Sequence, residues 1–200
     1  MLFPTFDYME WAKLAPDASV RFNLAGSGFD YDDPGLIEPD YARLRISGPN
    51  FYGSERIRGR IATRYGVPAE HVLNVAGTSL GIFLTAAALL EPGDEVLVEG
   101  PAYEPLVKAP TIAGARVNRF GRGFGSGFRV DVDRIRHALT PETKLVVVTD
   151  LHNPSGRALD ADTRRALVDL ADREGFTLFV DEVYRDFIAD YPNGQLARRA

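Results

Sequence analysis

Apolar runs alternate with amphipathic stretches along the chain from Ser54 onward. Four short runs rich in valine, leucine and phenylalanine predict buried strands at residues 96–98, 115–120, 145–150 and 177–180. Stretches of helical length and periodicity predict helices at residues 55–65, 79–90, 104–113, 131–139 and 162–173. Because strand and helix alternate, the sequence predicts an α/β fold with a mostly parallel sheet sandwiched by helices.

Local signals mark the ends of several predicted helices. Gly66 and Pro68 stop the helix at residues 55–65, because glycine and proline both interrupt helical backbone. Asp160 is a predicted N-cap for the helix at 162–173. Pro110 is expected to disturb the helix at 104–113, since it lacks a backbone N–H.

The first 50 residues have a weaker pattern than the rest of the chain. They contain two turn clusters, at residues 30–35 and 47–50, and one short predicted helix at residues 7–14. We therefore divide the chain into an N-terminal segment, residues 1–50, and part of a larger domain, residues 51–200.

Composition and charge exclude several classes of partner. The net charge is −5, and no basic cluster indicates nucleic-acid binding. The arginines are mostly interleaved with acidic residues, which predicts solvated faces. There is no cysteine, and the three histidines lack the spacing of metal ligands. The longest apolar stretch, residues 82–90, is too short to cross a membrane, and no signal peptide opens the chain, so a cytoplasmic location is expected.

Polar residues follow two of the predicted strands. Asn153 follows the run at 145–150, and Asp181 and Tyr184 follow the run at 177–180. In parallel α/β sheets, ligands bind at the carboxyl ends of the strands. An amide, a carboxylate and a phenol are therefore expected at one ligand. The alternatives are that Asp181 caps a following helix and that Tyr184 only packs against its neighbours.

Two further segments could contribute to the same site. Thr78 and Ser79 open a helix after Gly77, where free N–H groups and the helix dipole favour an anion, although serine and threonine are also ordinary N-caps. Tyr103 lies in the segment Gly100-Pro-Ala-Tyr and could stack on a planar ligand or rest on the surface.

Together these motifs resemble the class I/II aminotransferases, the fold type I enzymes that depend on pyridoxal 5'-phosphate (PLP). The resemblance lies in four segments, residues 76–96, 100–105, 145–156 and 177–184. The first of them contains the motifs Gly-Thr-Ser and Pro-Gly-Asp-Glu-Val. The resemblance implies the large-domain fold, PLP as cofactor, and an amino acid and a 2-oxo acid as substrates. It assigns the pyridine nitrogen to Asp181, the phenolic oxygen to Asn153 and Tyr184, the phosphate to Thr78 and Ser79, and ring stacking to Tyr103.

The resemblance also extends to positions near the N-terminus. Tyr52 is similar to a tyrosine that reaches the phosphate of the neighbouring subunit, which implies a homodimer. Gly28 resembles a glycine whose backbone meets the substrate carboxylate, to which Asn153 also contributes. His152 is interpreted as a supporting residue beside Asn153.

The lysine that forms the Schiff base in the family has no counterpart in this chain. In the family it lies downstream of the aspartate of Asp-Glu-Val-Tyr, and no lysine follows Asp181. Lys13, Lys108 and Lys144 do not match its motif. The resemblance covers nearly all of this chain but about half of a family member. We therefore expect a truncated chain that does not transaminate alone.

Three other kinds of function are alternatives to an aminotransferase. Another fold type I enzyme, such as a carbon–sulfur lyase, would use the same cofactor contacts. A non-catalytic remnant could retain PLP binding or dimerisation only. A Rossmann-type dinucleotide binder is disfavoured, because no Gly-x-Gly-x-x-Gly motif opens a helix after a strand; the glycines at 121–125 are not followed by one.

Overall fold

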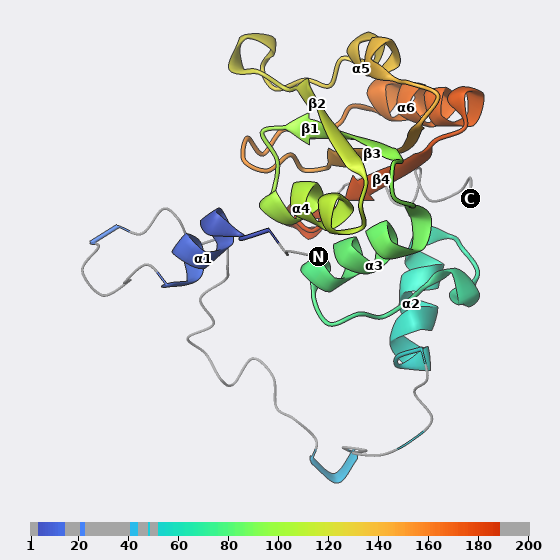
Figure 1. The fold of residues 1–200 in the computed structure, drawn as a ribbon. Helices are drawn as coiled ribbons and strands as arrows, with labels where there is room; N and C mark the ends of the chain where they lie inside the picture. The colour runs from blue at the N-terminus through green and yellow to red at the C-terminus, as the bar shows by residue number, and fades with distance from the viewer. Residues whose placement is uncertain (1–3, 15–20, 23–40, 44–47, 49–51, 189–200) are drawn as a thin grey trace.

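A parallel sheet of four strands organises the part of the chain that the structure describes. The computed structural model describes residues 4–14, 21–22, 41–43, 48 and 52–188. The strand order is β2-β1-β3-β4, and every pair is parallel (Figure 1). The strands are β1 (Glu95–Gly100), β2 (Arg116–Gly121), β3 (Thr143–Thr149) and β4 (Thr177–Asp181). All four predicted strands are confirmed, with ends that differ from the prediction by at most two residues.

The predicted helices are confirmed as well. They are α1 (Asp7–Leu14), α2 (Glu55–Tyr65), α3 (Thr78–Leu89), α4 (Glu104–Ile112), α5 (Val132–Ala138) and α6 (Ala161–Glu174). Short 3-10 turns lie at Tyr41–Arg43, Ala69–His71, Phe124–Ser126 and Arg185–Phe187. Pro110 falls in the last turn of α4, where the helix continues through it to Ile112.

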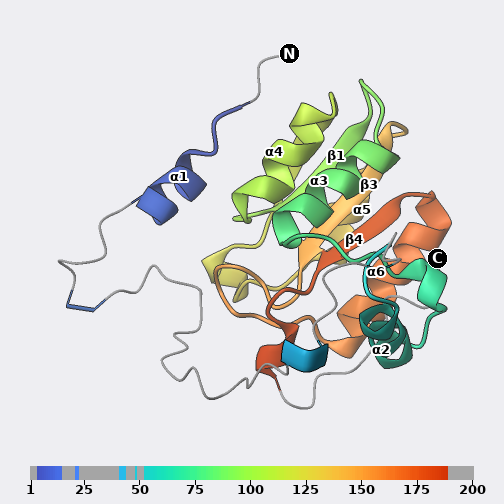
Figure 2. The same ribbon diagram turned by 90° about the horizontal axis from the view of Figure 1, so that it is seen from below.

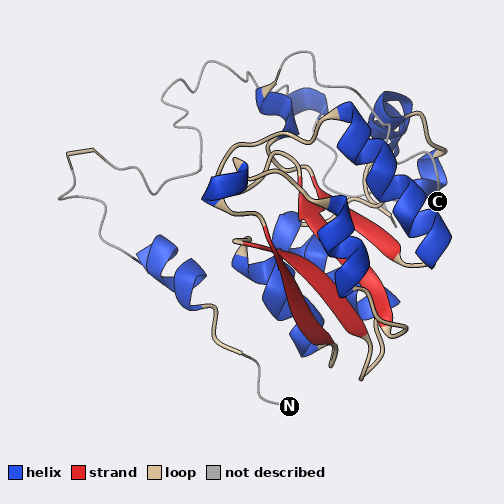
Figure 3. Ribbon diagram, turned by 90° about the horizontal axis from the view of Figure 1, so that it is seen from above, coloured by secondary structure: helices blue, strands red, loops and turns tan. Residues whose placement is uncertain are grey.

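The helices cover the sheet in two layers. Figure 1 shows α3 and α4 on one face and α5 and α6 on the other, and Figure 3 shows helices on both faces of the sheet. Because side chains alternate along a strand, Val96 and Val98 of β1 pack under α3 and α4 while Leu97 packs under α5 and α6. Six of the seven residues of β3 are buried, all except Lys144, as expected for a parallel strand covered on both faces.

The crossovers reverse direction between β1 and β3. The β1–α4–β2 unit moves one way across the sheet with its helix on the α3 side, whereas the next two crossovers move the other way with α5 and α6 on the opposite face. This combination is what right-handed crossovers require. A crevice for ligands is therefore expected at the carboxyl ends of β1 and β3, where the connections diverge.

Helix ends follow local sequence signals. Asp160 caps α6, since its side chain accepts a hydrogen bond from the Thr163 amide at 2.8 Å, as predicted. Asp131 caps α5 in the same way, with the Arg134 amide at 3.1 Å. Gly66 ends α2 at φ 67°, a left-handed conformation that favours glycine.

The expectation that the arginines lie on solvated faces is wrong for three of them. Arg122, Arg164 and Arg185 are buried, at 0%, 5% and 2% exposure. Each forms an ion pair with a carboxylate, and the three pairs are Arg122–Glu99, Arg164–Asp150 and Arg185–Glu182. Buried charges need such partners, because their separation from water is otherwise costly.

The N-terminal helix contacts the main body near the start of α4. The Met9 amide donates a hydrogen bond to Glu104 Oε2 at 3.2 Å, and α1 lies beside α4 in Figure 1. Most of residues 15–51 lie outside the described residues, so the boundary near residue 50 stays a prediction. Among the helices that the structure describes, none is long and apolar enough to cross a membrane.

Candidate active site

The residues selected from the sequence gather at the carboxyl edge of the sheet. Tyr103 follows β1, Asn153 follows β3, and Asp181 is the last residue of β4. Because the strands are parallel, all three ends lie at the same edge. The N-terminus of α3 reaches that edge too, since Ser79 Oγ and Tyr103 Oη lie 3.1 Å apart. Figure 2 shows α3 and α4 side by side against the sheet.

Asp181 is a buried carboxylate without a cationic partner among the described residues. Its side chain accepts one hydrogen bond, from the Val183 amide at 3.0 Å, and the residue is 4% exposed. Burial raises the pKa of the carboxyl group, and the Val183 hydrogen bond opposes that rise only in part. The carboxylate therefore caps a turn, not a helix, and its burial favours a ligand that carries positive charge.

The segment after β4 is held against the end of α2. Glu182 accepts hydrogen bonds from the Tyr65 hydroxyl at 2.9 Å and from Arg185 Nη1 at 3.2 Å. The Arg185 guanidinium also stacks over the Tyr65 ring, 4.5 Å from its centroid. Burial and the nearby Glu182 carboxylate raise the pKa of Tyr65, so its hydroxyl keeps the proton that it donates. These contacts fix the turn that begins at Asp181.

Tyr184 lies half-buried within this turn. Its ring packs edge-to-face against Phe187, with centroids 5.7 Å apart and an interplanar angle of 74°. In the described part of the chain its hydroxyl makes no hydrogen bond. The ring therefore packs against a neighbour, which is the alternative role considered for Tyr184. The hydroxyl is still available to a ligand.

The first turn of α3 presents amide groups without a side-chain cap. Gly77 occupies the N-cap position at φ 85° and ψ 157°, a conformation reserved for glycine. Thr78 and Ser79 are the first two helical residues and are exposed. They do not serve as N-caps, which was the alternative explanation of their position. Because glycine offers no side-chain oxygen, the first amides are available to an anion.

Asn153 lies on the loop after β3, and buried contacts of Asp150 hold the start of this loop in place. Asp150 accepts hydrogen bonds from the Leu159 amide at 2.8 Å and from Arg164 Nε at 3.3 Å. Arg164 Nη2 in turn donates to the Leu159 carbonyl at 2.6 Å. The loop is thereby anchored to α6, and the half-buried Asn153 side chain has no hydrogen-bond partner among the described residues.

His152 links the loops that carry Asn153 and Tyr103. Its Nε2 lies 3.1 Å from the Pro101 carbonyl and its Nδ1 lies 2.7 Å from Ser155 Oγ. A carbonyl only accepts, so Nε2 carries the proton and Nδ1 accepts from the Ser155 hydroxyl. Burial lowers the pKa of the ring, and the Arg122 charge acts in the same direction. These contacts give His152 a supporting place in the structure.

Two residues expected at the site are not joined to it by the structure. Tyr52 is 67% exposed, and its ring lies 5.9 Å from the Arg58 guanidinium carbon at the start of α2. Gly28 lies outside the described residues. Their roles stay predictions.

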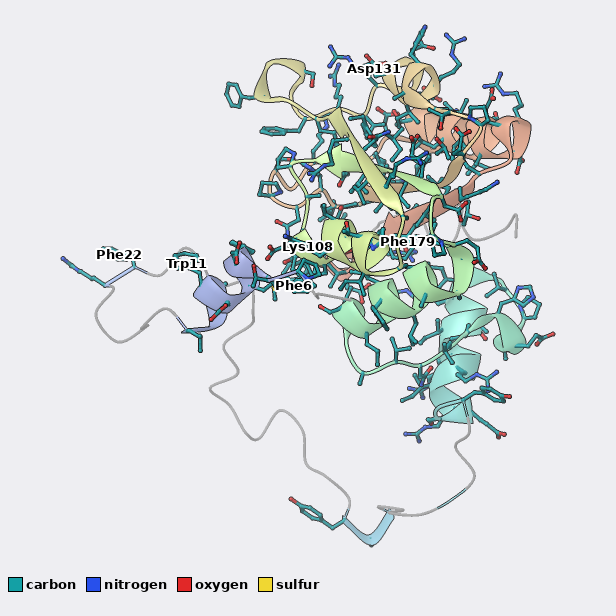
Figure 4. The ribbon with its side chains drawn as sticks, viewed as in Figure 1. Phe6, Trp11, Phe22, Lys108, Asp131 and Phe179 are labelled. Carbon is teal, nitrogen blue, oxygen red and sulfur yellow. The ribbon has the colours of Figure 1, made fainter. Side chains whose placement is uncertain are left out.

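The lysines of the chain occupy other places. Lys108 is on α4 (Figure 4), Lys13 is on α1, and Lys144 lies near the start of β3, at the edge opposite to the candidate site. None follows a strand at the carboxyl edge. The expectation that no lysine of this chain occupies the Schiff-base position stays a prediction.

The sequence did not single out Glu99 and Arg122, which form a fully buried ion pair beside the site, with Arg122 Nη1 2.7 Å from Glu99 Oε2. A glutamate at the end of an apolar strand was the available signal. A separate open groove of about 1090 Å³ lies between residues 126–133 and α6. Its lining mixes acidic and basic side chains.

The chain belongs to the aminotransferase class I and II family. The family's sequence profile matches residues 43–198, which span the whole sheet and the candidate site. Members of this family use pyridoxal 5'-phosphate.

Individual relatives agree with this assignment. The chain is 32% identical over 171 residues to arginine–pyruvate transaminase of Pseudomonas aeruginosa, covering 80% of the chain and 44% of that protein. It is 38% identical over 164 residues to capreomycidine synthase of Streptomyces vinaceus, covering 80% of the chain and 42% of that protein. The chain thus spans less than half the length of these relatives.

Solved structures show the same fold. Aspartate aminotransferase of Thermus thermophilus with maleate superposes with a TM-score of 0.67 at 29% identity, covering 74% of this chain and 40% of that one. N-succinyldiaminopimelate aminotransferase of Mycobacterium tuberculosis gives a TM-score of 0.65 at 29% identity, with coverage of 74% and 41%. The predicted fold class is confirmed, for the part of the fold that this chain contains.

Proposed function

We propose that this chain forms the cofactor-binding part of a PLP-dependent aminotransferase that moves an amino group between an amino acid and a 2-oxo acid. Family membership supports the reaction class, and the carboxyl edge of the sheet supports the place of binding. The single observation that carries the proposal is Asp181, a carboxylate that is buried at the end of β4 without a cation among the described residues.

The charge of Asp181 fits a protonated pyridine ring. A cationic ring nitrogen beside the carboxylate would supply the missing partner and lower the raised pKa. In return, Asp181 would hold the proton on that nitrogen. Bound PLP supplies an electron sink for breaking a bond at the α-carbon of an amino acid, and this property depends on the protonated ring.

The other residues would orient the ring from several sides. The Asn153 amide and the Tyr184 hydroxyl have no partner among the described residues, so both can donate to the phenolic oxygen. The uncapped first turn of α3, with the hydroxyls of Thr78 and Ser79, can receive the phosphate. Tyr103, held by Ser79, can lie against the ring face.

The placement of the lysines supports a further part of the proposal, namely that these 200 residues do not transaminate alone. None of the three lysines follows a strand at the carboxyl edge. A site without a lysine there can bind the cofactor noncovalently, but it lacks the amine that holds PLP and moves the α-proton. Sustained oxo-acid production by the purified chain with PLP and an amino donor would contradict this.

Several finer roles belong to the same proposal. Tyr52 would reach the phosphate of a second subunit in a homodimer, and Gly28 would contact the substrate carboxylate together with Asn153. A cytoplasmic location is also proposed. Sedimentation of the purified chain and fractionation of cells that express it would test the dimer and the location.

The experiment that tests cofactor binding is a titration of the purified chain with PLP, followed by the absorbance and fluorescence of the ring. Saturable binding is expected, and Asp181→Ala should weaken it by at least about tenfold, which corresponds to about 1.4 kcal/mol. Glu142→Ala, an exposed residue near the opposite edge, serves as a control that leaves binding unchanged. Equal affinities for the Asp181 variant and the unaltered chain would contradict the proposal.

One observation favours a second candidate function. Capreomycidine synthase, at 38% identity, does not carry a transaminase name. Another reaction on the same cofactor would use the same ring contacts, so the described residues are compatible with both. The two functions can be separated by product analysis of an enzyme form that contains a Schiff-base lysine. Formation of an oxo acid indicates transamination, whereas release of ammonia or of a rearranged amino acid indicates the other reaction.

A further inference from the structure

The pairing of β1 with β3 stops before either strand ends. The β1–β3 register runs only to Val98 and Val147. By contrast, β1 pairs with β2 as far as Gly100 and Gly121. The pairing of β3 with β4 extends to Thr149 and Asp181. Of the three strand pairs that the structure describes, only this central pair is split at the carboxyl edge of the sheet.

Side chains replace the missing backbone partners in this split. The Thr149 amide donates to Glu99 Oε1 at 2.9 Å, and the Thr149 carbonyl accepts from Arg122 Nη1 at 3.1 Å. The amide of the next residue, Asp150, faces β4 and donates to the Asp181 carbonyl at 2.8 Å. Because successive residues of a strand face opposite neighbours, the Thr149 backbone groups face β1. They bond to an ion pair where a continuous sheet would supply the β1 backbone.

The two charged side chains are held rigidly. Arg122 follows β2, and its amide continues the β1–β2 pairing by donating to the Gly100 carbonyl at 2.8 Å. Its Nη1 pairs with Glu99 Oε2 at 2.7 Å, and its Nε donates to the Phe128 carbonyl at 3.0 Å. Both side chains are completely buried. The Glu99 carbonyl, freed by the split, accepts from Arg119 Nε at 3.2 Å.

A second contact spans the same split farther from the sheet. His152 follows Thr149 after two residues, and its Nε2 meets the Pro101 carbonyl at 3.1 Å. Tyr103 and Asn153 lie just beyond this contact on the two sides. The strand ends that carry these two residues are thus set apart by the Glu99–Arg122 pair and joined again by His152.

We propose that Glu99 and Arg122 are positioning residues that keep β1 and β3 apart at the carboxyl edge, and thereby set the distance across which Tyr103 and Asn153 face the cofactor. The effect on the cofactor rests on the proposed function, whereas the split between β1 and β3 does not depend on it. A buried ion pair is a weak source of stability, and apolar replacements are often neutral or stabilising. The separation of β1 from β3 at the carboxyl edge therefore explains the two buried charges better than a gain in stability does.

The test combines a structural and a binding measurement on the 200-residue chain. The double variant Glu99→Leu/Arg122→Leu removes both partners of Thr149, so β1 and β3 should pair beyond Val98–Val147. New cross-strand nuclear Overhauser contacts in that stretch should appear, and PLP affinity should fall at least tenfold. The conservative double variant Glu99→Gln/Arg122→Met retains an acceptor for the Thr149 amide. It should keep the split and bind PLP within threefold of the unaltered chain.

Glu95→Leu is the matched control. Glu95 is a buried carboxylate at the other end of β1, where it accepts hydrogen bonds from the hydroxyls of Thr140 and Thr143 at 3.0 and 2.8 Å. Its loss should lower stability without changing PLP affinity. A leucine double variant that keeps the split, or that closes it yet binds PLP normally, overturns the inference.

A measurement on the unaltered chain makes the test independent of whether the variants fold. The Thr149 amide proton should exchange slowly with solvent, as a group bonded to a buried carboxylate does, and exchange at the rate of an exposed loop overturns the inference. If the unaltered chain shows the split but binds no PLP, the proposed function fails while the positioning of the strand ends stands.

Discussion

The hydroxyl of Tyr103 lies 3.1 Å from the hydroxyl of Ser79, which ties the loop after β1 to the first turn of α3. The two residues are 24 positions apart, and no local turn could bring them together. The contact joins the proposed ring-stacking residue to the proposed phosphate-binding turn. A cofactor in this place would therefore touch both residues.

This contact allows the two roles of Tyr103 to be separated. Tyr103→Phe keeps the ring and removes the hydroxyl, so we expect a loss of about 1 kcal/mol in the free energy of unfolding and little change in PLP affinity. Tyr103→Leu removes the stacking face and should weaken PLP binding about tenfold or more. Urea unfolding and PLP titration measure the two effects. Equal PLP affinities for the two variants would argue against stacking.

Asp181 should make the ligand-free protein less stable as the pH rises. Its folded pKa lies above the ordinary value because burial disfavours the charge. The unfolded chain therefore loses its proton first, and stability falls as the pH rises from about 3.8 through the folded pKa. Asp181→Asn keeps an oxygen for the Val183 amide and removes the charge, so it should be more stable than the unaltered chain above that window. The difference should vanish at low pH.

PLP should reverse this order of stability. A ligand at a hundred times its dissociation constant adds about 2.7 kcal/mol to the free energy of unfolding. The unaltered chain should gain this amount, whereas Asp181→Asn should gain much less at the same PLP concentration. Urea unfolding at neutral pH with and without PLP tests it, and equal gains would contradict the pairing of Asp181 with the ring nitrogen.

His152 should destabilise the protein in mild acid. Its pKa is lowered by burial, so at a pH below about 6.5 the unfolded chain binds a proton that the folded protein does not. Stability is full above that value and is lost as the pH falls toward the folded pKa. His152→Gln can still donate to Pro101 but does not titrate. The free energy of unfolding of the His152→Gln variant should therefore depend less on pH than that of the unaltered chain. Unfolding curves from about pH 5 to about pH 7.5, the range in which histidine titrates, measure this difference.

Breaking the buried pair Asp150–Arg164 by removing one partner should cost far more stability than breaking the exposed pair beside it. Arg164→Met leaves the fully buried Asp150 carboxylate without its guanidinium and should cost about 3–5 kcal/mol. Arg165→Met, one residue on, breaks an exposed pair with Asp162 and should cost no more than about 1 kcal/mol. Similar losses in urea unfolding for both variants would show that the loop anchored by Asp150 does not depend on this pair.

The sequence predicted the elements of the fold well, because local pattern determines them. The helix at residues 55–65 was predicted with the bounds that α2 has, and Asp160 was predicted as the cap of α6. The placement of Asn153 and Asp181 at one edge could be predicted, because each follows an apolar run and a parallel sheet brings such strand ends together.

The pairing of buried charges could not be predicted in the same way. Glu99 and Arg122 are 23 residues apart, and their contact requires that β2, β1 and β3 be neighbours in that order. Nothing local distinguishes Arg122 from the solvated arginines, so it was predicted to be exposed. Arg164 and Arg185 were missed for the same reason. Strand order is a long-range property, and it decides which charges meet.

The reversal of the crossovers between β1 and β3 has a consequence for the time course of refolding. The site is assembled from segments between Thr78 and Tyr184, so no short peptide of this chain contains it. Contacts between distant segments form late, because long loops must close first. Helical circular dichroism should therefore recover early in refolding, and the capacity to bind PLP should return only when all four strands are in place.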